Sequence, residues 1–353
     1  MLLVVIGAGA SYDSAASYPV SDPQRLHSHD PLVEQSRPPL ANGLFENRGW
    51  FAEALKRFPR CQAVVPYLRH LPQVKGVEQV LAKYLKEADR FPERHRQIMA
   101  VRYYLAYIMA HCEVQWETIH KGVTNQKALL DCIESWRYQN NESVCIVTFN
   151  YDTMIENACR GIGVIFQTLG DYVKGGEYKL YKLHGSIDWG RCVELPLQLL
   201  QDISPQAVAN ELVVRAADLR LMKKWSLVSG QPPMPPQSVS VAVCPAIAIP
   251  IEDKNEFECP PEHVESLKQC LPSATKMLTI GWRATEAHFL RLLKEGLPEG
   301  IPIMVVAGSF EGAKEVAIKL RGSTANILPA SGGFTDSILS RAIESFVWGR
   351  QHG

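Results

Sequence analysis

Short apolar runs that each end in glycine or polar residues constrain the fold of this 353-residue chain more than any other feature. A buried strand of a parallel sheet reads as a continuous apolar run, and a glycine directly after it allows a tight turn. Helical patterns follow most of these runs, as they do where strands and helices alternate. We therefore predict an α/β fold with a Rossmann-like, mostly parallel sheet.

The residues that follow these runs predict where a ligand binds. Open parallel sheets bind ligands at the carboxyl ends of their strands, and segments far apart in sequence can converge there. The clusters that would meet at this edge are residues 7–11, 148–152, 184–186, 281–282 and 308–309.

Two long segments interrupt the alternation of strands and helices. Residues 43–140 carry apolar side chains at helical spacing, such as Ile98, Val101 and Leu105, and contain no comparable strand-like run. Residues 193–275 mix helical stretches with a proline-rich loop and one strand-like run. We predict a single domain over residues 1–353, with a large helical insertion at 43–140 and a second insertion or small subdomain at 193–275.

Charge and cysteine usage exclude several classes of protein. Lys and Arg number 37, as do Asp and Glu, so nucleic-acid binding by this chain alone is disfavoured. No apolar run has the length of a signal peptide core or a membrane span. The nine cysteines include no C-x-x-C pair. Free buried thiols in a reducing compartment explain this pattern best, and we expect a cytoplasmic protein without a bound metal.

The first cluster is a candidate phosphate-binding turn. Gly7, Ala8 and Gly9 follow a strand and open a helix, where backbone N–H groups and the helix dipole favour an anion. A dehydrogenase-type G-x-G-x-x-G motif would need glycine at Tyr12, so hydride transfer is disfavoured. The alternative is that these glycines serve only the turn.

The next clusters offer polar side chains for catalysis. Thr148, Asn150 and Asp152 alternate around a strand end. An Asn here can hydrogen-bond a ribose hydroxyl or position a water molecule, and the alternative is that Asn and Asp serve as turn and helix-cap residues, which is a common role for both. His184 follows another strand, where it could orient a sugar, act as a general base or be merely structural.

Taken together, four segments resemble the ordered motifs of the sirtuin (Sir2) superfamily. They are residues 7–11, 148–152, 182–186 and 280–282. The nearer resemblance is to the bacterial SIR2-like effectors of anti-phage defence, which degrade NAD. Phe149 occupies the position, directly before the Asn, at which the protein-deacylating sirtuins share a Gln. The two C-x-x-C pairs of their zinc site are absent, so we expect no zinc ribbon.

The resemblance implies an NAD⁺ hydrolase that cleaves the nicotinamide–ribose bond to give nicotinamide and ADP-ribose, with NAD as the substrate. In this reading Asn150 positions the water or a ribose hydroxyl, and His184 contacts the ribose as base or orienter. Asp152 supports the nicotinamide end or orients Asn150. The implied NAD-binding residues are Gly7, Ala8, Gly9, Ser11, Thr148, Gly185, Ser186, Gly281, Trp282, Gly308 and Ser309. Gly9 should tolerate no large side chain, since its backbone would approach the diphosphate.

Other functions remain open at this point. A protein deacylase or ADP-ribosyltransferase would use the same NAD site with an acceptor groove, and a non-catalytic NAD- or ADP-ribose-binding subunit would not turn NAD over. A free NAD hydrolase would consume its own cell's cofactor. We therefore expect control by homo-oligomerisation or by a partner encoded nearby, such as a HerA-like ATPase or a nucleotide-sensing protein. Trp50, Trp116 and Trp136 are candidate contact residues, unless they belong to the core.

Overall fold

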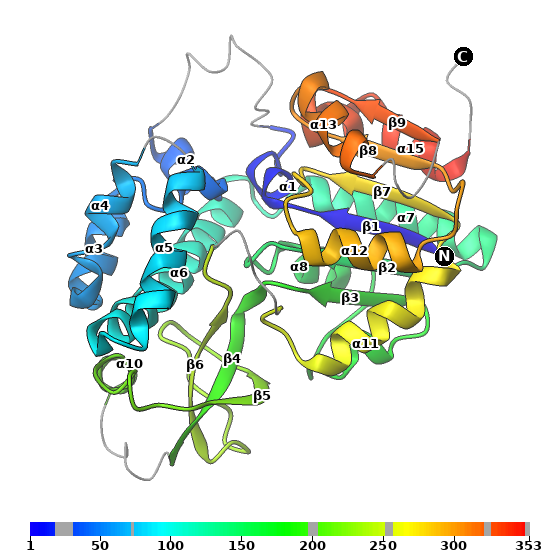
Figure 1. The fold of residues 1–353 in the computed structure, drawn as a ribbon. Helices are drawn as coiled ribbons and strands as arrows, with labels where there is room; N and C mark the ends of the chain where they lie inside the picture. Colours follow the sequence, from blue (N-terminus) through cyan, green and yellow to red (C-terminus); the bar gives the residue numbers. More distant parts are fainter. Residues whose placement is uncertain (18–30, 72–73, 197–203, 251–256, 321–325, 350–353) are drawn as a thin grey trace. The chain divides into compact units, whose positions relative to one another are not determined.

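The chain is divided into two compact units, each assembled from segments far apart in sequence (Figure 1). The computed structural model describes residues 1–17, 31–71, 74–196, 204–250, 257–320 and 326–349. Unit 1 comprises Met1–Pro38, Gln115–Leu183 and Pro261–Gly353, and unit 2 comprises Pro39–Val114 and His184–Pro260.

Unit 1 is built on a six-stranded parallel sheet with the strand order β3-β2-β1-β7-β8-β9. The strands are β1 (Leu2–Ile6), β2 (Val144–Thr148), β3 (Tyr178–Lys182), β7 (Lys276–Ile280), β8 (Ile303–Val306) and β9 (Ile327–Ala330). The central strands β1 and β2 are buried throughout, as their continuous apolar runs predict. The predicted α/β fold with a mostly parallel sheet is confirmed.

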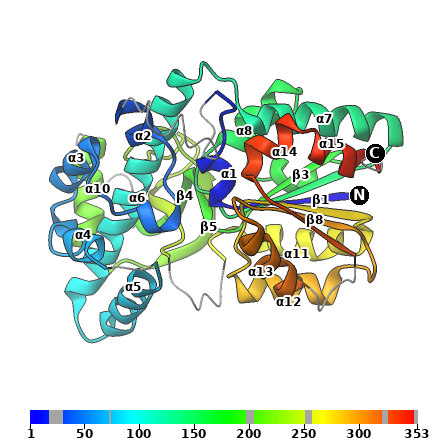
Figure 2. The same cartoon turned by 90° about the horizontal axis from the view of Figure 1, so that it is seen from above.

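Helices cover both faces of this sheet. Figure 2 shows α7, α14 and α15 on one face and α11, α12 and α13 on the other. The helices of unit 1 are α1 (Ala8–Tyr12), α2 (Pro31–Ser36), α7 (Asn125–Asn140), α8 (Met154–Gly161), α9 (Asp171–Lys174), α11 (Pro261–Cys270), α12 (Ala287–Gly296), α13 (Phe310–Leu320), α14 (Gly333–Leu339) and α15 (Ala342–Trp348), with a 3₁₀ turn at Leu271–Ser273.

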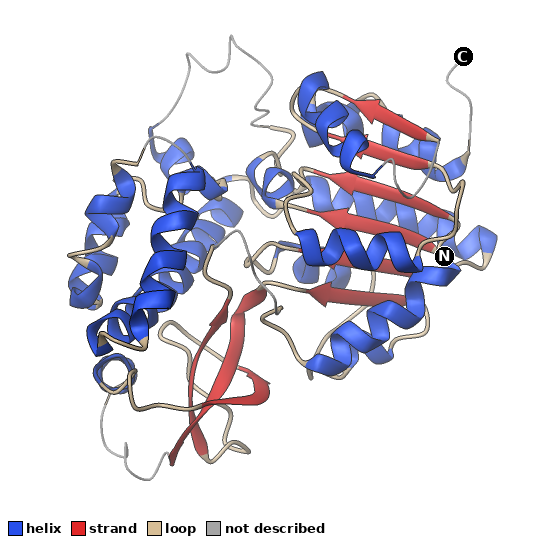
Figure 3. Cartoon of the chain, in the orientation of Figure 1, coloured by secondary structure: helices blue, strands red, loops and turns tan. Residues whose placement is uncertain are grey.

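Unit 2 combines helices with a small antiparallel sheet of strand order β5-β4-β6, drawn in red beside the helices in Figure 3. The helices are α3 (Gly49–Arg57), α4 (Val65–Arg69), α5 (Val74–Ala88), α6 (Pro92–Ile119) and α10 (Pro205–Val214), with 3₁₀ turns at Ala41–Gly43 and Pro59–Cys61. The strands are β4 (Gly185–Pro196), β5 (Leu221–Leu227) and β6 (Val241–Ile247). The last residues of α6, from Gln115 on, belong to unit 1.

The boundaries of the two predicted insertions differ from those of unit 2. Helix α7, which we predicted within the 43–140 insertion, belongs to unit 1. Its buried Asn125 and Gln126 amides donate to the carbonyls of Asp13 and Ala10, over 2.8 and 3.1 Å, and these bonds hold α7 to α1 and the residue that follows it. The second segment of unit 2 covers His184–Pro260, whereas the predicted insertion covers 193–275. Strand β4 begins at Gly185, and α11 belongs to unit 1.

Two of the three tryptophans considered as contact residues belong to the core. Trp116 is fully buried and donates from Nε1 to Ser14 Oγ, and Trp136 is also buried. Trp50 is half-buried. Of the two alternatives that the sequence left open for Trp116 and Trp136, the structure therefore supports the core.

None of the nine cysteines forms a disulfide bond, and eight of them are buried. In the described parts of the chain, no helix combines the length and the apolar character that crossing a bilayer requires.

Main chains approach one another unusually closely where β1 and β7 end. Ile6 lies opposite Ile280 in the parallel register, so the turns after both strands are level. Gly7 N donates to Ile280 O and Gly9 N donates to Gly281 O, each over 3.0 Å. Gly281 has a φ of 60°, and a Cβ there would lie 2.6 Å from Gly9 Cα. Glycine is therefore required at 281 both for its conformation and for space.

We predict that Gly281→Ala destabilises the protein far more than Gly163→Ala. Gly163 has a similarly positive φ of 83°, but a Cβ there would meet nothing within 4 Å. The control should lose about 1–2 kcal/mol from the left-handed backbone alone. Gly281→Ala should lose roughly 1–3 kcal/mol more, because the new methyl group overlaps α1. Denaturant unfolding of both variants measures the difference, and equal losses would show that the close approach is unimportant.

Candidate functional site

Asn150 occupies the turn after β2 and is only 7% exposed. Its Nδ2 donates to Gly7 O over 3.0 Å and to Ser11 Oγ over 2.8 Å. Because a carbonyl can only accept, the Gly7 contact fixes which end of the amide is nitrogen. Asn150 Oδ1 is buried, and the described residues offer it no hydrogen-bond donor. The turn thus holds one oriented acceptor without a partner in the described chain.

Ser11 connects Asn150 to Asp152. Ser11 Oγ donates to Asp152 Oδ2 over 2.7 Å, and its only proton is used there, so its lone pair accepts from Asn150. Asp152 Oδ1 also accepts from the backbone N of Met154, at the start of α8, over 3.3 Å. We call these three residues the Asn150 relay. They meet because β1 and β2 pair with Ile6 opposite Thr148.

A buried lysine supports the relay from β3. Lys182 is fully buried, and its Nζ donates to Asp152 O and, over 2.7 Å, to Glu156 Oε1. Tyr172 OH donates to the same Glu156 oxygen over 3.3 Å. Lysine is almost never fully buried without a partner, so Lys182, between Tyr181 and Leu183, was a signal for this pair. Lys182 was not among the predicted site residues.

Several backbone N–H groups of the predicted phosphate turn already donate hydrogen bonds within the protein. The N–H groups of Gly7, Gly9 and Ala10 donate to carbonyls within unit 1. A Cβ on Gly9 would lie 2.8 Å from Gly281 Cα, so packing within the protein already excludes a larger residue. The effect of a Gly9 substitution therefore does not report on a ligand, and the diphosphate contact stays a prediction. Ala8 lies half-buried in the same turn.

Trp282 and Phe149 form an aromatic cluster with Phe289. The Trp282 and Phe149 rings stack with centroids 5.9 Å apart, and both meet Phe289 edge to face. Trp282 Nε1 donates to Glu286 Oε2 over 2.7 Å. Phe149 thus fills an apolar cluster, where an amide side chain would lose its water without a matching partner. This packing accounts for an aromatic residue at the position before Asn150.

The remaining predicted residues of unit 1 have local structural contacts. Thr148 Oγ1 accepts from Asn150 N over 3.1 Å and shapes the turn. Gly308 and Ser309 are exposed after β8. Ser309 Oγ accepts from Gly312 N over 3.1 Å, which caps α13. Contacts of these residues with NAD stay predictions.

His184, Gly185 and Ser186 belong to unit 2. His184 O accepts from Ala248 N over 2.9 Å, and Gly185 pairs with Ile247. Gly185 has a φ of 78°, and a Cβ there would overlap the Ala246 carbonyl oxygen. Ser186 is fully buried. The structure brings Ser11, Asn150 and Asp152 together, whereas the approach of His184 to Asn150 stays a prediction.

No group of three or more His, Cys, Asp or Glu side chains gathers as a metal site would need within the ranges that the structure describes.

Comparisons with known proteins find similarity only to solved structures. No known family model matches the chain, and no curated protein matches it. A Sir2 homologue mutant in complex with ADP-ribose is 13% identical with a TM-score of 0.37, covering 98% of this chain and 92% of that one. Sir2Tm bound to a propionylated peptide is 11% identical with a TM-score of 0.39, covering 98% and 94%. TM-scores this low do not establish a common fold, so the proposals below rest on the chain's own contacts.

We predict that Lys182→Met lowers the free energy of unfolding by about 3–5 kcal/mol, because it leaves the buried Glu156 carboxylate without its cation. The control Lys268→Met breaks an ion pair with Glu265 in which both side chains are about half exposed, and should cost no more than about 0.5 kcal/mol. Adding Glu156→Gln should restore part of the loss. If denaturant unfolding shows equal effects of the two lysine variants, Lys182 does not support the turn.

Proposed function

We propose that this chain cleaves the nicotinamide–ribose bond of NAD with water. The observation that supports the proposal best is the oriented, buried Oδ1 of Asn150 with no donor among the described residues. An unsatisfied buried acceptor costs about 1–3 kcal/mol, and buried acceptors in native proteins nearly always have a partner. A ligand hydroxyl or a water molecule that donates to Oδ1 would remove this cost.

The relay makes Asn150 an acceptor toward its ligand. Both Nδ2 protons already go to Gly7 and Ser11, so only a donor can bind the free oxygen. A water molecule or a ribose hydroxyl meets this requirement, and a carbonyl or phosphate oxygen does not. Asp152 Oδ2 accepts the Ser11 proton, which keeps that proton away from Asn150 and thereby fixes this polarity. Asp152 and Ser11 thus serve as positioning residues for Asn150.

The proposed reaction balances without a further reactant. Water forms a bond to the ribose C1′, and the C1′–N bond breaks with its electron pair going to the nicotinamide ring, which becomes neutral. One proton is released, with His184 as the proposed base or ribose-orienting group. The products are nicotinamide and ADP-ribose. Holding water and sugar in a reactive arrangement accounts for much of the rate that such a site can supply.

We propose that the other predicted residues line the NAD site. The turn at Gly7 and Ala8 would lie beside the diphosphate, and Gly308 and Ser309 beside the adenosine half. Ser11 stays in this group as a prediction, although its hydroxyl already contacts Asn150 and Asp152.

Asn150→Ala and His184→Ala should each reduce nicotinamide release from NAD by about a hundredfold or more, the scale of losing a positioned group. Ser11→Ala should reduce it less, by roughly tenfold, because it removes only the support of Asn150. The control Asn210→Ala changes an exposed amide of α10 and should leave turnover unchanged. The assay is nicotinamide release with and without an acetylated peptide, together with the intact mass of the protein.

The outcomes separate the candidate functions. Full turnover in folded Asn150→Ala and His184→Ala variants would contradict the proposed site. Release that requires the peptide would favour a deacylase, and a mass increase of the protein would favour ADP-ribosyl transfer. Binding of NAD without release would favour a non-catalytic module.

We also propose that assembly restrains this activity, either with a second copy of the chain or with a partner protein in anti-phage defence. An unrestrained hydrolase would deplete the NAD of its own cell, so a resting state of low activity is needed. Turnover and particle size, measured together over a range of protein concentrations, should change in parallel. A strict monomer with full, concentration-independent turnover and no response to the product of a neighbouring gene would contradict this idea.

A further inference from the structure

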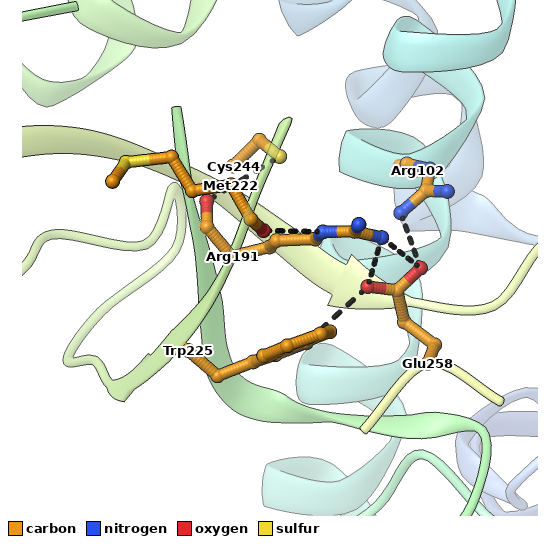
Figure 4. A network of polar contacts seen from close by, with 6 residues as sticks. All are labelled: Arg102, Arg191, Met222, Trp225, Cys244 and Glu258. Atoms are coloured by element: carbon orange, nitrogen blue, oxygen red, sulfur yellow. Dashed lines mark hydrogen bonds and ion pairs between the residues drawn. The ribbon is translucent and has the colours of Figure 1, made fainter. Parts of the chain in front are cut away.

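Glu258 lies at the centre of a polar network in unit 2 (Figure 4). The residue is only 7% exposed. Its carboxylate oxygens accept from Arg102 Nη1 over 3.1 Å and from Arg191 Nη1 over 3.2 and 3.4 Å. Trp225 Nε1 donates to Oε1 over 3.3 Å. One carboxylate thus joins α6, β4 and β5.

The network holds the carboxylate firmly because it is both charged and buried. Burial raises the pKa of the Glu258 carboxyl, but the charges of Arg102 and Arg191 outweigh it, and the pKa lies below its ordinary value. The Arg191 guanidinium is itself fixed, since its Nε donates to Met222 O over 3.0 Å. Separating a buried charge from such partners is strongly unfavourable, so Arg102, Arg191 and Trp225 hold the carboxylate of Glu258 in place.

The backbone of Glu258 lies against the turn that carries His184. Glu258 belongs to neither a helix nor a strand. A Cβ on Gly185 would lie 3.2 Å from Glu258 O and would overlap Ala246 O on the other side. Ala248 N donates to His184 O. The main chain at positions 184 and 185 is therefore bounded by β6 and by Glu258.

We infer that Glu258 is a positioning residue that fixes the His184-Gly185 turn, and through it the imidazole of His184. The inference rests on the proposed function, in which His184 contacts the ribose. Arg102, Arg191 and Trp225 hold the side chain of Glu258, and its backbone closes one side of the turn. If the carboxylate loses these partners, the backbone at 258 shifts and the turn gains freedom. A misplacement of about 1 Å in a reacting group can reduce turnover on the order of a hundredfold.

Two variants and a matched control test this inference in the full chain. Glu258→Gln removes the charge with little change in size, and the milder Trp225→Phe removes only one donor. The control Glu211→Gln breaks the exposed ion pair with Arg215 in the same unit. Glu258→Gln should lower kcat for nicotinamide release about ten- to a hundredfold, with little change in KM, and Trp225→Phe should lower it less. Glu211→Gln should leave both constants unchanged.

A second readout follows His184 directly and needs no activity. The imidazole NMR signal of His184, identified by its loss in His184→Ala, should shift in Glu258→Gln and Trp225→Phe but not in Glu211→Gln. In the His184→Ala background, Glu258→Gln should have no further effect on turnover, since both act through one group. The inference would be overturned if the His184 signal did not move. It would also be overturned if Glu258→Gln reduced turnover by the same factor in the His184→Ala background as in the otherwise unchanged protein. A shifted signal in a protein that never cleaves NAD would support the positioning role and refute the proposed function instead.

Discussion

The candidate site of unit 1 depends on the close approach of two main chains, at the ends of β1 and β7. Gly7, Gly9 and Gly281 have no side chains, and a Cβ on Gly7 would lie 2.6 Å from Trp282 Cα. This contact fixes the start of α1 at the carboxyl ends of β1 and β7. Ser11 of this helix contacts Asn150 in the turn after β2. The Asn150 relay depends on this placement, because the Gly7 carbonyl orients the amide and the Ser11 hydroxyl links it to Asp152.

Buried ion pairs hold the segments that carry the proposed catalytic residues. Lys182 binds the Asp152 carbonyl and Glu156 in unit 1, and Glu258 binds two arginines in unit 2. Such pairs contribute little net stability compared with apolar packing, but losing one partner is costly. We propose that their role is specificity, since Lys182 contacts the turn that carries Asp152 and the backbone of Glu258 lies against the His184-Gly185 turn. Both pairs lie beside segments that the sequence motifs identify.

Local patterns predicted the strands of the parallel sheet, but they did not indicate which unit each helix of the long segments joins. The continuous apolar runs identified β1, β2, β7 and β8, because a strand buried on both faces leaves an unambiguous apolar run. Helix α7 carries apolar side chains at helical spacing, as α6 does, yet its amides donate to α1 and to Asp13 directly after it. Periodicity reports that a helix has a buried face, but not which neighbour covers it.

The roles of single site residues needed the tertiary structure. Ser11 was predicted to hold a diphosphate, but the register of β1 and β2 gives its hydroxyl two protein partners. Glu258 carries no sequence motif, and its partners Arg102 and Arg191 are 156 and 67 residues away. The sequence by itself determined the parallel strands and the polar turns at their carboxyl ends, since burial and turn conformation are local requirements. Only the tertiary structure decided which polar atoms are paired and which acceptor is left open, because hydrogen bonds between distant segments depend on strand order and register.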